Sequence, residues 1–162
     1  SKKRLVRMEE NLSRLGFEVE TICTDAATWQ PKTPFDAILL DAPCTATGSL
    51  RRHPDVARLK SDEDVTRLAA DQDRLIANAA QMLAPGGTLV YCTCSLQKEE
   101  GEDRIADALK TISSLKRSPI TADEIGGLTQ AITKNGEMRT LPCHLTELGG
   151  LDGFFAARLI KN

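Results

Sequence analysis

The sequence lacks several features that would place a protein in a class at once. No apolar run in its 162 residues approaches the roughly 20 residues that a membrane-spanning helix needs. No charged segment followed by an apolar one resembles a secretory signal. Its five cysteines contain no C-x-x-C pair and its two histidines are far apart, which argues against a zinc site and a disulfide framework. We therefore expect a cytoplasmic protein with reduced thiols.

The sequence also lacks an excess of charge of either sign. Its 21 basic and 23 acidic residues give a net charge of −2, so the overall charge does not attract the chain to nucleic acid or to a membrane surface. The hydrophobic fraction of 41% and the charged fraction of 27% are ordinary for a globular protein. A chain of this length can form one domain with a core of its own.

Two apolar runs that each lead to a cysteine organise the rest of the chain. The first covers residues 36–41 and is followed by Ala-Pro-Cys44, and the second covers residues 88–92 and is followed by Thr-Cys94. Neither run alternates between apolar and polar residues, which is typical of a strand buried on both faces of a parallel sheet. We predict that the ends of these two strands lie side by side and form one active site.

The remaining patterns predict an α/β fold. Apolar residues at helical spacing predict helices, and short apolar or alternating runs bounded by glycine and proline predict strands. The predicted helices cover residues 2–15, 61–83 and 99–109, and the predicted strands cover residues 17–23, 36–41, 88–92, 137–141 and 154–160. This order predicts a mostly parallel sheet that ends in an antiparallel pair. Ligands of such sheets bind beyond the carboxyl ends of the strands.

The cysteines divide into two kinds by their positions. Cys23 and Cys92 lie inside predicted strands, and we interpret them as small buried hydrophobic residues. Cys44 and Cys94 each follow a strand, next to small or turn-forming residues, where a thiol can be reached by a substrate. These two are the candidate catalytic cysteines.

Charged residues near the strand ends have two interpretations each. Asp25 and Asp41 could cap the turns that follow their strands, or accept hydrogen bonds from a ligand. Arg51, Arg52 and His53 could form a solvated basic turn, or contact the phosphates of an anionic substrate held over the thiols. We interpret the acidic run between residues 99 and 103 more simply, as carboxylates that stabilise a helix N-terminus.

Several segments together resemble the Sun/Fmu-type family of RNA cytosine-5 methyltransferases. Residues 41–55, which open with Asp-Ala-Pro-Cys-Thr-Ala-Thr-Gly, resemble motif IV of that family, and residues 85–95, which close with Thr-Cys-Ser, resemble motif VI. Residues 152–159 resemble its closing strand, and residues 2–16 resemble the helix after motif II. Within the family the chain is most similar to the bacterial enzymes that methylate small-subunit ribosomal RNA.

The resemblance implies a role for each candidate residue. It assigns the covalent nucleophile, which attacks C6 of cytosine, to Cys94, and help in releasing the product to Cys44. It places Asp41 between cofactor and target base, and Asp25 at the adenine side of S-adenosylmethionine. Attack at C6 activates C5, which is otherwise a poor nucleophile toward the methyl group. The implied substrate is a single-stranded or splayed-out segment of ribosomal RNA, because the base must leave its stack to reach the thiols.

The chain also departs from the family pattern. The family's glycine-rich motif I and acidic motif II would precede residue 1, and no G-x-G-x-x-G occurs in the chain. We therefore expect residues 1–162 to be a single partial catalytic domain with a Rossmann-like class I methyltransferase fold that lacks its first strands. We also expect the family's N-terminal RNA-binding domain to be absent and the isolated chain to be inactive.

Two other functions remain open from the sequence. A DNA cytosine-5 methyltransferase also uses a Pro-Cys motif, but there the Pro-Cys thiol, here Cys44, would be the nucleophile. The Thr-Cys-Ser motif around Cys94 argues against that function. The second alternative is a non-catalytic RNA-binding scaffold.

Overall fold

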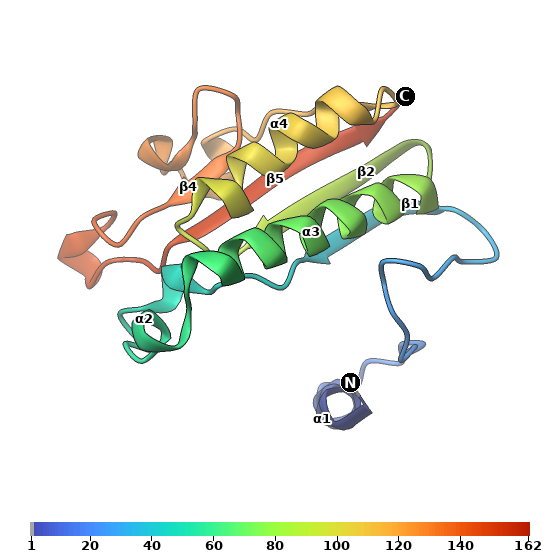
Figure 1. Cartoon of the computed structure of the whole chain (residues 1–162), viewed down its shortest axis with the longest axis horizontal. Helices are drawn as coiled ribbons and strands as arrows, with labels where there is room; N and C mark the ends of the chain where they lie inside the picture. The colour runs from blue at the N-terminus through green and yellow to red at the C-terminus, as the bar shows by residue number, and fades with distance from the viewer. Residues whose placement is uncertain (1) are drawn as a thin grey trace.

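A mixed five-stranded sheet forms the centre of the structure, a computed structural model that describes residues 2–162 (Figure 1). The strands are β1 (Phe35–Asp41), β2 (Leu83–Thr93), β3 (Leu115–Arg117), β4 (Met138–Thr140) and β5 (Phe154–Lys161). The helices are α1 (Lys2–Arg14), α2 (Val56–Leu59), α3 (Asp62–Met82) and α4 (Glu102–Thr111). Two of the short 3₁₀ helices matter for the site, η1 (Thr47–Ser49) and η2 (Lys98–Glu100).

The strand order is β1-β2-β5-β3. β3 and β4 pair with the same edge of β5, β3 near the C-terminal end of β5 and β4 near its N-terminal end. β1 and β2 are parallel, whereas β5 is antiparallel to β2, β3 and β4. Four strands therefore run in one direction and only β5 opposes them. The predicted α/β fold with a C-terminal antiparallel pair is confirmed, and the predicted strand at 137–141 is β4.

Helix α3 follows from clear local signals. Ser61 and Asp64 form a capping box at its N-terminus, and the first turn is acidic, which suits the positive end of the helix dipole. Its apolar face packs on the sheet, on the same side as α4 (Figure 1). The resulting core joins α3, α4 and the inner strands, and its largest fully buried members are Ile76, Leu83, Leu89, Tyr91, Ile105, Phe155 and Leu159.

The predicted strand at residues 17–23 is wrong. This segment is irregular and mostly exposed, with Phe17 61% and Val19 59% accessible. β-Propensity stabilises a strand only where a neighbouring strand completes its hydrogen bonds, and within residues 2–162 nothing pairs with this segment. Cys23 is accordingly exposed rather than buried as predicted. The preceding helix is confirmed as α1, but none of its residues is buried, and it lies apart from the sheet (Figure 1).

β1 forms where the sequence predicts it but is not buried on both faces. In the described part of the chain β2 is its only neighbour, so β1 is an edge strand and Leu39 is 73% exposed. β2 begins at Leu83, earlier than predicted, and includes Gly86, whose φ of +79° only glycine adopts readily. Cys92 is buried in β2, as expected.

The helix predicted from residue 99 begins at Glu102, because residues 98–100 form η2 instead. None of the helices between residues 2 and 162 combines the length and apolarity needed to cross a membrane.

Candidate active site

The thiols of Cys44 and Cys94 lie at the carboxyl ends of the two parallel strands. Asp41, the last residue of β1, is in register with Cys92 of β2, so the chain leaves both strands at the same edge of the sheet. Cys44 and Cys94 follow these two positions by a few residues, and their sulfur atoms are 3.5 Å apart. The predicted convergence of the two strand ends is therefore confirmed.

The two thiols differ in acidity although they touch. The hydrogen bond from Cys44 lowers the pKa of Cys94 to about 7, against an ordinary value near 9.0. The same hydrogen bond, together with burial, raises the pKa of Cys44 far above that ordinary value. When the pair loses one proton, the negative charge therefore lies on Cys94 and Cys44 keeps its proton. One member is suited to act as a nucleophile and the other to act as a proton donor.

The loop that carries Cys44 is held by a buried carboxylate. The Glu100 side chain accepts hydrogen bonds from the backbone N–H of Thr45 at 2.9 and 3.2 Å and from the Thr45 hydroxyl. Gln72 of α3 donates to the Pro43 carbonyl at 2.8 Å and to Glu100 at 3.2 Å. The position of Glu100 after Glu99 suggested that it stabilises a helix N-terminus. Its side chain instead binds the Cys44 loop. Sequence reasoning missed this function because its partners lie far away in the chain.

The same loop also touches the segment after Cys94. The Gly48 N–H donates to the Cys94 carbonyl at 2.9 Å, and the Gly153 N–H donates to the Gly48 carbonyl at 2.8 Å. A Cβ atom at Gly48 would overlap the Gly153 carbonyl and lie 2.9 Å from the Cys94 carbonyl oxygen. Glycine is thus required at position 48 by close backbone approach rather than by an unusual φ angle.

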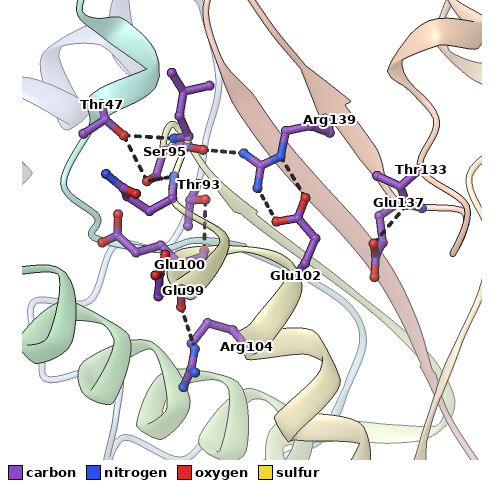
Figure 2. Close-up of polar contacts among 12 residues, drawn as sticks. Thr47, Thr93, Ser95, Glu99, Glu100, Glu102, Arg104, Thr133, Glu137 and Arg139 are labelled. Atoms are coloured by element: carbon purple, nitrogen blue, oxygen red, sulfur yellow. Dashed lines mark hydrogen bonds and ion pairs between the residues drawn. The ribbon is translucent and has the colours of Figure 1, made fainter.

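Ser95, which follows β2, contacts residues of both η1 and β4 (Figure 2). Its hydroxyl contacts that of Thr47 at 3.2 Å, and Thr47 in turn accepts the N–H of Leu96 at 2.9 Å. Arg139 of β4 donates to the Ser95 carbonyl and binds Glu102 with two hydrogen bonds of 3.1 and 2.6 Å. Arg139 is a further functional candidate that the sequence did not reveal, because residues 111–150 display mainly turn signals.

A cleft of about 1030 Å³ opens onto the thiols. Besides Cys44 and Cys94, it is lined by α1, the irregular segment 24–27, the end of β1 and one side of α3. Both predicted cofactor carboxylates, Asp25 and Asp41, lie on its wall. The volume is that of a pocket for a cofactor or a nucleotide.

Asp25 reaches this cleft without the strand that was predicted to precede it. Its carboxylate accepts the N–H of Ala27 at 3.0 Å, which is the Asx turn that the sequence suggested as one interpretation. Its other oxygen lies 3.9 Å from Arg74 of α3. Asp41 is exposed at the end of β1 and accepts a weak hydrogen bond from the Cys92 thiol at 3.8 Å. Both carboxylates retain room to accept hydrogen bonds from a ligand.

Arg51, Arg52 and His53 lie in the connection between η1 and α2 and are exposed, but the two arginines already bind other parts of the chain. Arg51 donates to the carbonyls of Gly149 and Gly150, and Arg52 pairs with Asp152 at 2.6 Å. These contacts fasten the connection to the segment before β5. His53 is exposed. Phosphate binding by Arg51, Arg52 and His53 stays a prediction. Within residues 2–162 no group of His, Cys, Asp or Glu side chains is arranged to hold a metal ion.

Comparison with known protein families gives a match over nearly the whole chain. Residues 1–160 match the model of the family described as 16S rRNA methyltransferase RsmB/F. The chain is 43% identical to ribosomal RNA small subunit methyltransferase B of Pseudomonas syringae pv. tomato, over 98% of the chain and 35% of that relative. It is 40% identical to the protein of the same name from Erwinia tasmaniensis, over 98% of the chain and 34% of that relative. The chain thus spans about a third of the length of these relatives.

Solved structures agree with this match. The crystal structure of NSun6 from Pyrococcus horikoshii with SFG superposes with a TM-score of 0.79 at 34% identity, over 99% of this chain and 39% of that one. A methyltransferase homolog protein from Pyrococcus horikoshii superposes with a TM-score of 0.75 at 29% identity, over 100% of this chain and 51% of that one. The architecture of residues 2–162 is therefore that of a Rossmann-like methyltransferase fold.

Proposed function

Because the chain belongs to the 16S rRNA methyltransferase RsmB/F family, we propose that it carries the chemical site of an enzyme that methylates C5 of cytosine in ribosomal RNA. The observation that carries this proposal is the pair of unequal thiols, 3.5 Å apart at the ends of two parallel strands. Cytosine C5 methylation needs one thiolate that attacks and a second group that assists departure. The site offers one thiol suited to each task.

In the proposed first step the Cys94 thiolate attacks C6 of the target cytosine. A carbon–sulfur bond forms, and the electron pair of the C5–C6 double bond makes C5 nucleophilic. S-adenosylmethionine supplies the methyl group when bound. The lowered pKa of Cys94 supports this assignment, because a substantial fraction of the thiol is already ionised near neutral pH.

In the second step a water molecule from the solvent accepts the proton at C5 as the bond between C6 and sulfur breaks. The electron pair of the C5–H bond restores the double bond, and Cys94 departs as a thiolate. Cys44 assists this departure as the proton-bearing partner at 3.5 Å, since its hydrogen bond stabilises the leaving thiolate. A DNA-type assignment, in which Cys44 attacks, would require ionisation of the less acidic thiol.

The walls of the cleft fit the cofactor. A volume of about 1030 Å³ accommodates a nucleoside-sized ligand beside a flipped base. Asp25 and Asp41 present carboxylate oxygens, the acceptor type that amino and hydroxyl groups of such a ligand require. We assign Asp25 to the adenine side and Asp41 to the region between cofactor and base. The exposed basic residues 51–53 lie in the loop after Cys44, where they could contact phosphates of the RNA.

The chain is about a third as long as the relatives it matches, so the activity proposed here is that of the natural protein at full length. We further propose that residues 1–162 form one part of its catalytic domain and depend on other segments for tight cofactor binding. Robust methyl transfer to ribosomal RNA by residues 1–162 alone would contradict this dependence.

The proposed function is tested by trapping on RNA that contains 5-fluorocytosine. Fluorine replaces the hydrogen at C5 and cannot leave as a cation, so the elimination that breaks the bond between C6 and sulfur is blocked and the covalent adduct accumulates. The full-length protein should form an adduct that survives denaturation, Cys94→Ala should form none, and Cys44→Ala should still form it. An adduct that persists in Cys94→Ala but disappears in Cys44→Ala would reverse the assignment. No adduct with any variant would favour a non-catalytic RNA-binding scaffold.

A further inference from the structure

Glu100 is a fully buried carboxylate, and no Lys, Arg or His side chain within residues 2–162 forms an ion pair with it. Its exposed fraction is 0%. Two guanidinium groups near η2 pair with other acids: Arg104 binds Asp73 and Asp107, and Arg139 binds Glu102. Burying an ionised carboxylate is unfavourable unless hydrogen bonds replace its hydration. The hydrogen-bond partners of the Glu100 side chain therefore indicate its role.

All side-chain partners of Glu100 lie around the Cys44 loop. Two are the N–H and the hydroxyl of Thr45, the residue directly after Cys44. The third is the amide of Gln72, which also holds the carbonyl of Pro43, the residue directly before Cys44. Glu100 and Gln72 thus fix the backbone on both sides of the Cys44 thiol. Thr45, Gln72 and Glu100 are each 0% exposed.

The backbone of Glu100 is in turn fixed to the strand that leads to Cys94. Its carbonyl accepts a hydrogen bond from the Tyr91 hydroxyl at 2.8 Å. It accepts a second from the Thr93 hydroxyl at 3.2 Å (Figure 2). Both donors belong to β2. Glu100 therefore connects β2 through its carbonyl to the Cys44 loop through its carboxylate. It acts beside the backbone hydrogen bonds from Ala42 to Cys92 and from Gly48 to Cys94, which join the same two segments.

Loss of the carboxylate should disturb Cys44 rather than Cys94. The end of β2 is held by its ladder with β5, in which Thr93 pairs with Phe155, and by the N–H of Gly48 on the Cys94 carbonyl. Neither contact uses the Glu100 side chain. The loop at Thr45, by contrast, has its backbone N–H bound by that side chain.

We propose that Glu100 is a positioning residue, which holds Cys44 at the distance from Cys94 that is needed to release the methylated base. This inference rests on the proposed function, in which Cys94 forms the covalent bond and Cys44 assists its cleavage. It assigns Glu100 to release and not to attack. A carboxylate is required because both of its oxygens accept hydrogen bonds, whereas an amide at the same place would turn a donor toward another donor.

The test uses Glu100→Gln in the full-length natural protein, with ribosomal RNA and S-adenosylmethionine. At about pH 8, where loss of the Cys44 hydrogen bond changes the reactivity of Cys94 least, methyl transfer in a single turnover should stay within about threefold of wild type. The steady-state rate should fall by about 10- to 100-fold, the usual effect of a misplaced catalytic group, and covalent protein–RNA adduct should accumulate on denaturing gels. A variant that loses the single-turnover step as strongly as the steady-state rate, or that accumulates no adduct, would overturn the inference.

A matched control is Glu137→Gln. Glu137 is also a buried glutamate, 1% exposed, but it binds Arg117 and Thr133 away from the thiols. This variant should lose stability without accumulating adduct. If it accumulates adduct to the same extent as Glu100→Gln, general destabilisation explains the effect and the inference fails.

A double variant separates positioning from an independent role. Once Cys44 is replaced by alanine, Glu100 has no thiol left to position, so Cys44→Ala with Glu100→Gln should release product no more slowly than Cys44→Ala alone. Multiplicative effects of the two changes would contradict the inference.

If Glu100→Gln does not fold, Thr45→Val tests the positioning role of Glu100 instead. It removes the hydroxyl donor while leaving the backbone N–H on Glu100, so it should slow release by a smaller factor with the same accumulation of adduct. Release at the wild-type rate would overturn the inference. Absence of adduct in the wild type, or its presence in Cys94→Ala, would instead refute the proposed function and the inference with it.

Discussion

Replacing Cys44 by alanine should make the Cys94 thiol less acidic. The hydrogen bond from Cys44 is the largest contribution to the lowered pKa of Cys94, which lies at about 7 instead of 9.0. Alanine cannot donate this hydrogen bond, so the pKa of Cys94 should return toward its ordinary value. A thiol is ionised above its pKa, so the variant, in which the pKa of Cys94 is higher, must be taken to higher pH before Cys94 reacts.

At pH 7 the two pKa values give very different fractions of thiolate. A thiol with a pKa of about 7 is roughly half ionised there, and one with a pKa of about 9 is about 1% ionised, a ratio of about 50. The more basic thiolate is the better nucleophile, by roughly 6- to 10-fold for a pKa difference of about two at a Brønsted coefficient of about 0.4–0.5. The net loss of reactivity is therefore about 5- to 8-fold at pH 7. Above pH 9 the variant should react faster than wild type, and the two profiles should cross near pH 8.

Alkylation by iodoacetamide measures this directly. The rate at the Cys94 peptide is followed by mass spectrometry between pH 5.5 and 10, in wild type and in Cys44→Ala. Cys143→Ala is the control, because Cys143 is exposed and does not line the cleft. Identical midpoints in wild type and Cys44→Ala, or a wild-type midpoint near 9, would refute the reasoning.

Two further predictions concern the packing around the thiols. Gly48→Ala should destabilise the fold by about 1–3 kcal/mol in urea unfolding and abolish adduct formation, because its Cβ would displace the backbone at Cys94 and Gly153; a fully active variant would show that the close approach is not needed. Arg139→Met should cost about 2–4 kcal/mol in the same measurement, since it removes the donor to the Ser95 carbonyl and leaves a partly buried glutamate unpaired. Arg139→Lys, which keeps the charge, should lose less, and equal losses in the two variants would contradict the role of the guanidinium fork.

The sequence predicted the meeting of Cys44 and Cys94 because it depends on short-range signals. An apolar run that ends in a small or turn-forming residue defines a buried strand and its exit, and parallel pairing brings such exits to one edge. Register then fixes the distance, since Asp41 is paired with Cys92.

The supports of the site could not be predicted in the same way. Glu100 binds a residue 55 positions earlier in the chain, and in the sequence it is indistinguishable from an acid at a helix N-terminus. Arg139 reaches Ser95 across β5 from a segment dominated by turns. Both contacts depend on the final packing of elements that carry no local signal of one another.

The strand predicted at 17–23 was wrong because the prediction used the local pattern alone. Its alternating residues satisfy the local pattern, but a strand needs a neighbour to complete its hydrogen bonds, and within residues 2–162 none pairs with it. Leu39 on the edge strand β1 shows the same limit, because an apolar residue is buried only where another element covers it.

The central claim is that Cys94 forms the covalent bond to the RNA. It is tested most directly by digesting the trapped complex of the full-length protein with 5-fluorocytosine RNA and sequencing the peptide that carries the nucleotide. The account predicts that the modified residue is Cys94. A nucleotide on Cys44, or no modified cysteine at all in a protein that methylates RNA, would contradict it.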